Sequence, residues 1–214
     1  METVKTFCVN EFNNFTLYNI MIINEIKQEA LGQGVPIIDD GALAELLAVV
    51  VEHKPKTILE VGTGVGYSGI AMLSAGGDKS EARLFTIEKC ADRVKQANRN
   101  FFNAGLSKSV KIIGADAIDV LPSFAEVYLA GEKTNYVDFI FLDGPKAQYI
   151  NYLPYLLEAL RVGGILFADN VLYEGKESIK KKMQFFVTHI TTNKNLRTSI
   201  LDVGTGVSIT QKLK

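Results

Sequence analysis

The sequence predicts an α/β fold: a seven-stranded, mostly parallel sheet with helices on both faces and an antiparallel last strand. Short apolar runs alternate with segments of helical periodicity, and most of those runs are apolar on both faces. This pattern is typical of a parallel sheet covered on each side. The 214 residues suit a single domain, with an N-terminal helical extension (1–53) and a core (54–214).

Two helices are expected before the first strand. Apolar residues recur at helical spacing over residues 14–30, and Gly32 and Gly34 end that segment. Asp39 or Asp40 can cap a second helix that runs to about residue 52. The apolar content of these helices makes a homodimer plausible, and we expect one.

The core alternates strands with helices from residue 57 onward. The expected strands are 57–61, 84–87, 110–113, 137–142 and 165–168, and the expected helices are 67–74, 91–103, 117–129, 148–160 and 178–188. Two β-rich runs, 198–203 and 207–211, flank Gly204-Thr205-Gly206 and predict a hairpin. Residues 200–207 repeat the pattern of residues 58–65, but a second nucleotide loop would need a helix after the glycines. Only seven residues follow Val207, so we favour the hairpin.

Composition and charge exclude several classes of protein. The net charge of −1, from 23 Lys plus Arg against 24 Asp plus Glu, argues against a protein that holds nucleic acid by bulk charge. Two Cys cannot form a disulfide framework, and the two separated His, outside any HExxH motif or His-Cys cluster, argue against a zinc site. We expect neither a signal peptide nor a membrane span, and hence a cytoplasmic protein.

A Gly-rich turn, residues 60–68 (EVGTGVGYS), connects the first core strand to the following helix. Gly62 and Gly64 permit a sharp turn and the close approach of a ligand. Glu88 ends the next strand, where a carboxylate can accept hydrogen bonds from both hydroxyls of a ribose. Together the turn and the acid predict an adenosine-containing ligand.

The identity of that ligand depends on a second carboxylate. Residues 64–69 satisfy the GxGxxG pattern of NAD-binding proteins, so an NAD-dependent oxidoreductase is one alternative. Glu60, however, directly precedes the turn, where it would repel a pyrophosphate and favour a cationic sulfonium. This favours S-adenosylmethionine. Asp116 can either accept the adenine amino group or cap a helix, and the sequence leaves both open.

Two further strand ends carry hard oxygen donors. Asp143 follows the fourth core strand, and Asp169 and Asn170 follow the fifth. Neighbouring parallel strands lie about 4.8 Å apart, so the three side chains can converge on Mg²⁺ or another hard divalent cation. The alternative is that the acids are caps or loop formers. Lys146 can act as a general base near such an ion, or be an ordinary exposed lysine.

At this point the sequence resembles the class I, metal-dependent O-methyltransferases, which include the catechol and caffeoyl-CoA O-methyltransferases. The resemblance covers about residues 35–209 and is carried by ILEVGTGVGYSG, IEK, FLDGPKAQY and ADNVLYEGK. VPIIDDGALAELL and the closing VGTGVSIT are most similar to the bacterial members that methylate 5-hydroxyuridine in tRNA.

The resemblance implies a Rossmann-like fold and a set of site residues. Metal ligation is assigned to Asp143, Asp169 and Asn170, with Lys146 as the base. The cofactor contacts it implies, together with Gly64 and Asp116 from the loop analysis, are Ile38 (through its backbone), Glu60, Gly62, Gly64, Ser68, Glu88, Ala115, Asp116 and Asp143.

The expected reaction is methylation of a hydroxyl that lies beside a second oxygen. The first choice of substrate is 5-hydroxyuridine in tRNA, and the alternative is a small catechol or caffeoyl-CoA-like phenol. Lys180, Lys181 and Lys182 can contact tRNA phosphates or form a solvated helix face. A non-catalytic binding module that keeps the fold is a further alternative.

Overall fold

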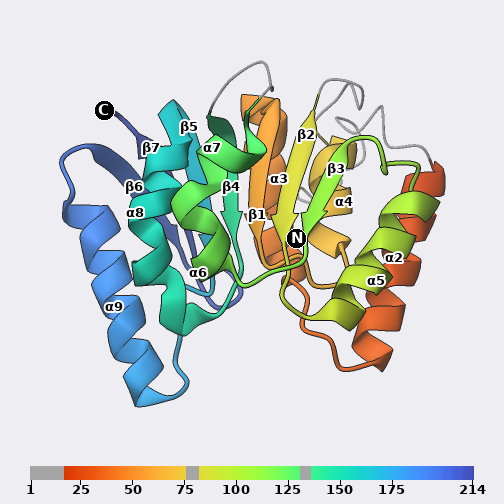
Figure 1. Ribbon diagram of the computed structural model, residues 1–214. Helices are drawn as coiled ribbons and strands as arrows, with labels where there is room; N and C mark the ends of the chain where they lie inside the picture. The colour runs from red at the N-terminus through yellow and green to blue at the C-terminus, as the bar shows by residue number, and fades with distance from the viewer. Residues whose placement is uncertain (1–16, 76–81, 131–135) are drawn as a thin grey trace.

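The computed structural model describes residues 17–75, 82–130 and 136–214, which form a seven-stranded sheet in the order β3-β2-β1-β4-β5-β7-β6 (Figure 1). The β7 strand runs antiparallel to both of its neighbours, and the other adjacent pairs are parallel. This confirms the predicted fold. The strands are β1 (Thr57–Val61), β2 (Arg83–Ile87), β3 (Val110–Ile113), β4 (Val137–Leu142), β5 (Leu160–Asp169), β6 (Leu196–Leu201) and β7 (Val207–Lys212).

Helices cover both faces of the sheet because its inner strands are apolar on both sides (Figure 1). In β1, Ile58 belongs to one hydrophobic core and Leu59 to the other. The first core includes α2 (Leu17–Gly32), α3 (Asp40–His53), α4 (Tyr67–Ala75) and α5 (Ala91–Asn103), and the second includes α6 (Ala117–Val120), α7 (Phe124–Tyr128), α8 (Tyr149–Ala159) and α9 (Glu177–Thr192). Among the described helices, none has the length and apolarity needed to cross a membrane.

The N-terminal extension follows the prediction closely. The expected helix over 14–30 is seen as α2, and residues 14–16 lie outside the described residues. Asp39, not Asp40, caps α3, because its side chain accepts a hydrogen bond from the Gly41 backbone N–H at 2.9 Å. On α2, Met21 and Leu31 are exposed. The homodimer stays a prediction.

The prediction of one continuous helix over residues 117–129 is wrong. The chain instead forms α6, a 3-10 turn η1 (Leu121–Ser123) and α7. Pro122 lies in that turn. A proline ring fixes φ, has no N–H to donate and clashes with the preceding turn, so a continuous α-helix is interrupted here.

The closing hairpin is confirmed, with Leu201 paired to Val207 across β6 and β7. Gly204 and Gly206 adopt left-handed backbone conformations, with φ of 59° and 82°. The turn also binds the segment that follows β5: Val171 donates to the Gly206 carbonyl at 2.9 Å and Leu172 to the Thr205 carbonyl at 3.0 Å. The repeated VGTG motif therefore supports the end of β5 rather than a second nucleotide.

Candidate active site

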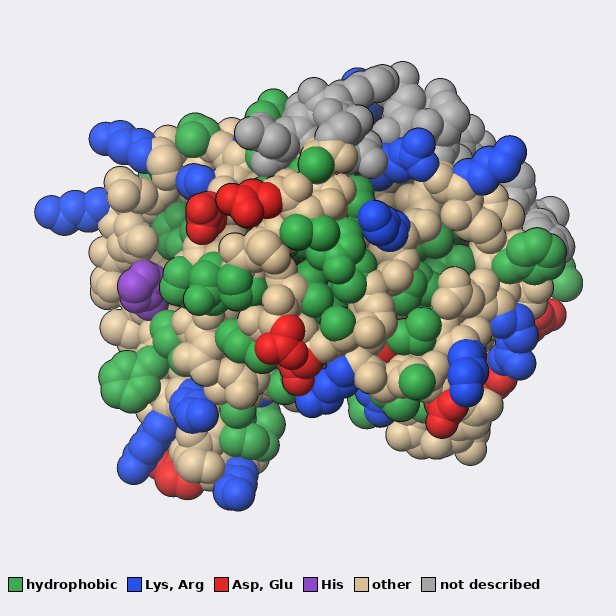
Figure 2. Space-filling model, viewed as in Figure 1, with side chains coloured by type: hydrophobic (Ala, Val, Ile, Leu, Met, Phe, Trp, Pro, Cys, Tyr) green, Lys and Arg blue, Asp and Glu red, His purple; other side chains and the backbone are tan. Residues whose placement is uncertain are grey.

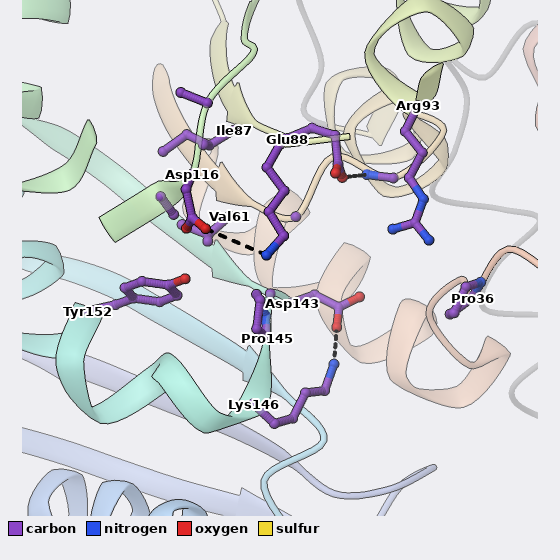
Figure 3. Close-up of a pocket in the computed structure, with 16 residues that line it drawn as sticks. Pro36, Val61, Ile87, Glu88, Arg93, Asp116, Asp143, Pro145, Lys146 and Tyr152 are labelled. Atoms are coloured by element: carbon purple, nitrogen blue, oxygen red, sulfur yellow. Dashed lines mark hydrogen bonds and ion pairs between the residues drawn. The ribbon is translucent and has the colours of Figure 1, made fainter. Parts of the chain in front are cut away.

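The sheet reverses its strand order at β1, which has β2 on one side and β4 on the other. In open α/β sheets ligands bind at the carboxyl ends of the strands beside such a reversal. A cavity of about 310 Å³ opens there (Figure 3). It is lined by the predicted base, Lys146, and by six predicted cofactor residues: Gly62, Gly64, Glu88, Ala115, Asp116 and Asp143.

The Gly-rich turn lies against the loop that carries Asp143. Gly62 has φ of 104°, and a Cβ at this position would collide with the Asp143 backbone carbonyl. Asp143 in turn donates its backbone N–H to the Val61 carbonyl at 2.9 Å. Only glycine fits at residue 62, because any side chain would push the two strand ends apart.

Glu88 connects the turn to the second strand. Its Oε2 accepts from the Gly64 backbone N–H at 3.0 Å and its Oε1 from the Cys90 backbone N–H at 2.9 Å. The carboxylate is thereby held at the cavity wall, where each oxygen retains a second lone pair for a ligand hydroxyl. Its contact with a ribose stays a prediction.

Glu60 and Ser68 lie behind the cavity wall rather than on it. The Glu60 carboxylate is fully buried and accepts hydrogen bonds from Ser68 Oγ at 2.5 Å and Thr86 Oγ1 at 2.6 Å. Thr63 continues this chain of hydrogen bonds to Thr86 at 2.6 Å. The network ties β1, β2 and α4 together. Direct cofactor contacts from Glu60, Ser68 and the buried Ile38 stay predictions.

Asp116 performs the capping role that the sequence left open. Its Oδ1 accepts from the Ile118 backbone N–H at 3.4 Å, at the start of α6. Its Oδ2 lies 3.5 Å from Lys89 Nζ, and both residues line the cavity. The adenine contact stays a prediction, which the position of Asp116 on the cavity wall permits.

Asp143 and Asp169 lie side by side. Leu142 pairs with Ala168 in the parallel register of β4 and β5, so the next residue of each strand is a carboxylate. Asp169 is 2% exposed; burial, and after it the charge of Asp143, raises the pKa of Asp169 to about 6. A cation placed beside Asp143 and Asp169 would therefore favour the ionised form of Asp169.

Asn170, the third predicted metal ligand, directly follows Asp169. Asn170 has φ of 58°, donates its backbone N–H to Asp169 Oδ1 at 2.7 Å and donates its amide N–H to Thr205 Oγ1. Within the described parts of the chain, these bonds leave the amide oxygen available to coordinate a cation. Among the described residues there is no group of three or more His, Cys, Asp or Glu placed to hold a metal, so such a site depends on the Asn170 amide.

Lys146 supplies the nearby positive charge. Its Nζ lies 2.8 Å from Asp143 Oδ1, and both side chains are about three-quarters buried. Burial raises the pKa of Asp143, and the Lys146 ammonium lowers it in part. The lysine is thus held by its partner with its amine on the cavity wall (Figure 3).

The sequence matches the model of the O-methyltransferase family over residues 13–213. The chain belongs to the O-methyltransferase family. This membership favours a sulfonium donor over NAD.

Curated and solved relatives agree with this assignment. A catechol O-methyltransferase of Niastella koreensis is 36% identical over 147 residues, which cover 67% of this chain and 62% of the relative. A caffeoyl-CoA O-methyltransferase of Stellaria longipes is 33% identical over 122 residues, covering 57% and 48%. An O-methyltransferase of Bacillus cereus, solved in complex with SAH, superposes with a TM-score of 0.77 at 22% identity, covering 90% of both chains.

The match spans less than two thirds of either curated relative, and the solved structure supports the fold alone. The curated relatives are named for catechol and caffeoyl-CoA, not for tRNA. The comparison thus supports the small-phenol alternative better than the tRNA substrate.

Three residues of this O-methyltransferase site were missed by the sequence analysis. Thr86 holds Glu60, Tyr149 donates its hydroxyl to the Leu142 carbonyl at 3.0 Å and the Asp169 carbonyl at 3.2 Å, and Tyr152 lines the cavity. A polar Thr inside the apolar run LFTI was a usable signal. The two tyrosines are spaced as core residues of an amphipathic helix, and nothing local distinguishes them from packing residues.

The buried Glu60 predicts a pH-dependent stability. Burial raises the pKa of Glu60 from its ordinary 4.5 to about 7. The unfolded carboxyl loses its proton near the lower value and the folded one near the higher value, so the stability that Glu60 contributes falls as pH rises between them. The wild-type protein should lose about 3 kcal/mol relative to Glu60→Gln across this range.

This is measured as the difference in unfolding free energy between the two proteins at pH 5 and pH 7.5. Asp169 titrates over a similar range, but its effect cancels in the difference because both proteins carry it. A difference that does not change with pH would show that Glu60 ionises normally.

Proposed function

We propose that this chain is an S-adenosylmethionine-dependent O-methyltransferase that acts on a small catechol-type phenol. The observation that carries this proposal is a shared residue: Asp143 lines the adenosine-type cavity with Glu88, and it is also the neighbour of Asp169 at the candidate cation site. A donor held by the Gly-rich turn and an acceptor held at the strand ends would meet there. The family match supports the reaction, and the names of the relatives support the substrate class.

Mg²⁺ or another hard divalent cation fits the corner formed by Asp143, Asp169 and Asn170. The charge of Asp143 helps to raise the pKa of the buried Asp169, so a cation that contacts both carboxylates would be stabilised there. The Asn170 amide oxygen would complete a set of hard oxygen ligands. When bound, the ion would lower the pKa of a chelated hydroxyl and orient the substrate's two oxygens.

The chain's own residues then have separate tasks. Lys146 is paired with Asp143 as an ammonium, so it first releases a proton to water, which its partial exposure allows; the neutral amine then accepts the proton of the substrate hydroxyl. The phenolate oxygen forms a bond to the methyl carbon as the carbon–sulfur bond breaks, and S-adenosylhomocysteine leaves. Because the donor methyl is already activated, most of the acceleration comes from holding the two reactants in line.

The proposal is tested by a methyl-transfer assay on a catechol panel and on total tRNA, with Mg²⁺ or with EDTA. Methylation of a catechol that EDTA abolishes and Mg²⁺ restores is expected. Transfer to tRNA but not to any catechol would overturn the substrate class. Undiminished transfer in EDTA would overturn the cation.

The lysine run of α9 provides an independent test of the substrate. Lys180 is paired with Glu174 and Lys181 lies 3.9 Å from Glu177, so acidic neighbours offset part of the charge. Figure 2 shows basic side chains with an acidic one among them at the lower left, where α9 begins. Changing Lys180, Lys181 and Lys182 together to Glu should alter catechol methylation by less than about twofold, because exposed pairs contribute little. If the wild type methylated tRNA in a salt-sensitive manner and the variant did not, tRNA would become the substrate.

A further inference from the structure

We propose that Tyr152 is a specificity-determining residue for the cofactor: its hydroxyl donates a hydrogen bond to an adenine ring nitrogen that flanks the amino group held by Asp116. The inference rests on the proposed function and deepens its cofactor site. It starts from a buried polar atom that the fold itself leaves without a partner.

Tyr152 belongs to α8 and lines the cavity, although its side chain is fully buried by the surrounding residues. Within the described parts of the chain, its hydroxyl has no hydrogen-bond partner. Tyr149, one turn earlier on the same helix, uses its hydroxyl to bridge two strand-end carbonyls. Buried hydroxyls are usually paired. Among the described residues three have no partner, those of Ser74, Tyr152 and Ser208, and of these only Tyr152 lines the cavity, so a group that enters the cavity can supply its partner.

The position of Tyr152 suits a contact with the adenine ring of the cofactor rather than with its ribose. Figure 3 shows its hydroxyl on the side of the ring that faces into the cavity, below Asp116, and the charge of Asp116 acts on it. Glu88, at the end of β2, is the predicted ribose acceptor, and Asp116 follows β3, the next strand outward. A ribose at Glu88 would therefore place its base between Asp116 and Tyr152.

Tyr152 offers a hydrogen-bond donor and Asp116 offers an acceptor. Burial, and after it the charge of Asp116, raises the pKa of Tyr152 to about 12, so the phenol stays protonated and remains a donor. An ionised Asp116 can only accept hydrogen bonds. Adenine presents an amino donor next to ring-nitrogen acceptors, which matches this pair. Hypoxanthine carries an oxygen in place of the amino group and would face the carboxylate unpaired.

The test is calorimetric titration of S-adenosylhomocysteine into the wild type, Tyr152→Phe and Tyr155→Phe. Tyr155 lies on the same helix and does not line the cavity, so its variant is a matched loss of one hydroxyl. We expect Tyr152→Phe to weaken binding about three- to tenfold, the usual effect of losing one hydrogen bond, and Tyr155→Phe to change it by less than about twofold.

Analogues identify the atom that is bound. The 1-deaza and 7-deaza forms of S-adenosylhomocysteine each lack one ring nitrogen that flanks the amino group. We expect one of these analogues to bind the wild type as weakly as S-adenosylhomocysteine binds Tyr152→Phe. The affinity of that analogue should be the same for the wild type and for Tyr152→Phe, because the hydrogen bond is already lost, as in a double-mutant cycle.

The outcomes separate this inference from the proposed function. Unchanged binding of S-adenosylhomocysteine to Tyr152→Phe, or an equal loss for the parent and both analogues, would overturn the role of Tyr152. Failure of the wild type to bind S-adenosylhomocysteine at all would instead overturn the proposed cofactor.

Discussion

Asp169→Ala should lower the rate of methyl transfer by about a thousandfold or more while S-adenosylhomocysteine still binds. A bound cation contributes several kcal/mol to such a transition state, and each 1.36 kcal/mol is a factor of ten in rate. Asp169 does not line the cavity that would hold the cofactor, so binding should change by only a few-fold. Rates are measured at saturating donor with Mg²⁺, and binding by calorimetry.

Asp169→Asn is the matched control for this prediction, because its amide oxygen can still accept the Asn170 backbone N–H. In EDTA the variant should be as stable as the wild type or more so. The folded-state pKa of Asp169 is raised to about 6, so its carboxylate lowers stability as pH rises from the ordinary range through that value. Neutralising it removes up to about 3 kcal/mol of this cost at pH 7.5.

Loss of activity together with unchanged or increased stability would separate a functional carboxylate from a structural one. Full activity of Asp169→Ala in the presence of a chelator would contradict the metal role. A marked drop in the melting temperature of Asp169→Asn would show that the carboxylate stabilises the end of β5 instead.

Lys146→Met should lower the single-turnover rate by about 10²–10⁴-fold, the usual contribution of a positioned general base. The thioether keeps the apolar contacts of the lysine stem, so the binding of S-adenosylhomocysteine should survive. The measurement is the rate of product formation with saturating catechol and donor.

Lys146→Arg distinguishes a base from a charge partner. The guanidinium keeps a positive charge near Asp143 but stays protonated at any pH of interest, so it cannot accept the phenol proton. We expect the Arg variant to be as impaired as Lys146→Met. Recovery of the rate with Arg would mean that the lysine acts by neutralising Asp143.

Several parts of the site could be predicted from local sequence. The turn over residues 60–68 follows an apolar strand, and Gly62 proves to be the position where no side chain fits. Lys146 follows Asp143 by three residues, a spacing at which the two side chains meet within a single turn of chain. The closing hairpin was predictable because too few residues follow its glycines to form a helix.

Other predictions depended on contacts that sequence does not encode locally. The interruption of the predicted helix at Pro122 is the exception, because a proline is a local signal. Glu60 lies behind the Gly-rich turn, where Thr86 on the adjacent strand is its buried partner, and its contact with the ligand stays a prediction. The unpaired hydroxyl of Tyr152 could not be distinguished from a packed core tyrosine.

The amino-acid sequence alone determined the order of strands and helices, the glycine turn with its acidic partner, and the residue types at the ends of β4 and β5. Those features depend on local backbone preference and on the periodicity of apolar residues. Only the tertiary structure decided that Asp143 and Asp169 are neighbours, that Glu60 is enclosed, and that Tyr152 faces the cavity. These depend on which strands pair and in what register, and that is set by packing between segments far apart in the chain.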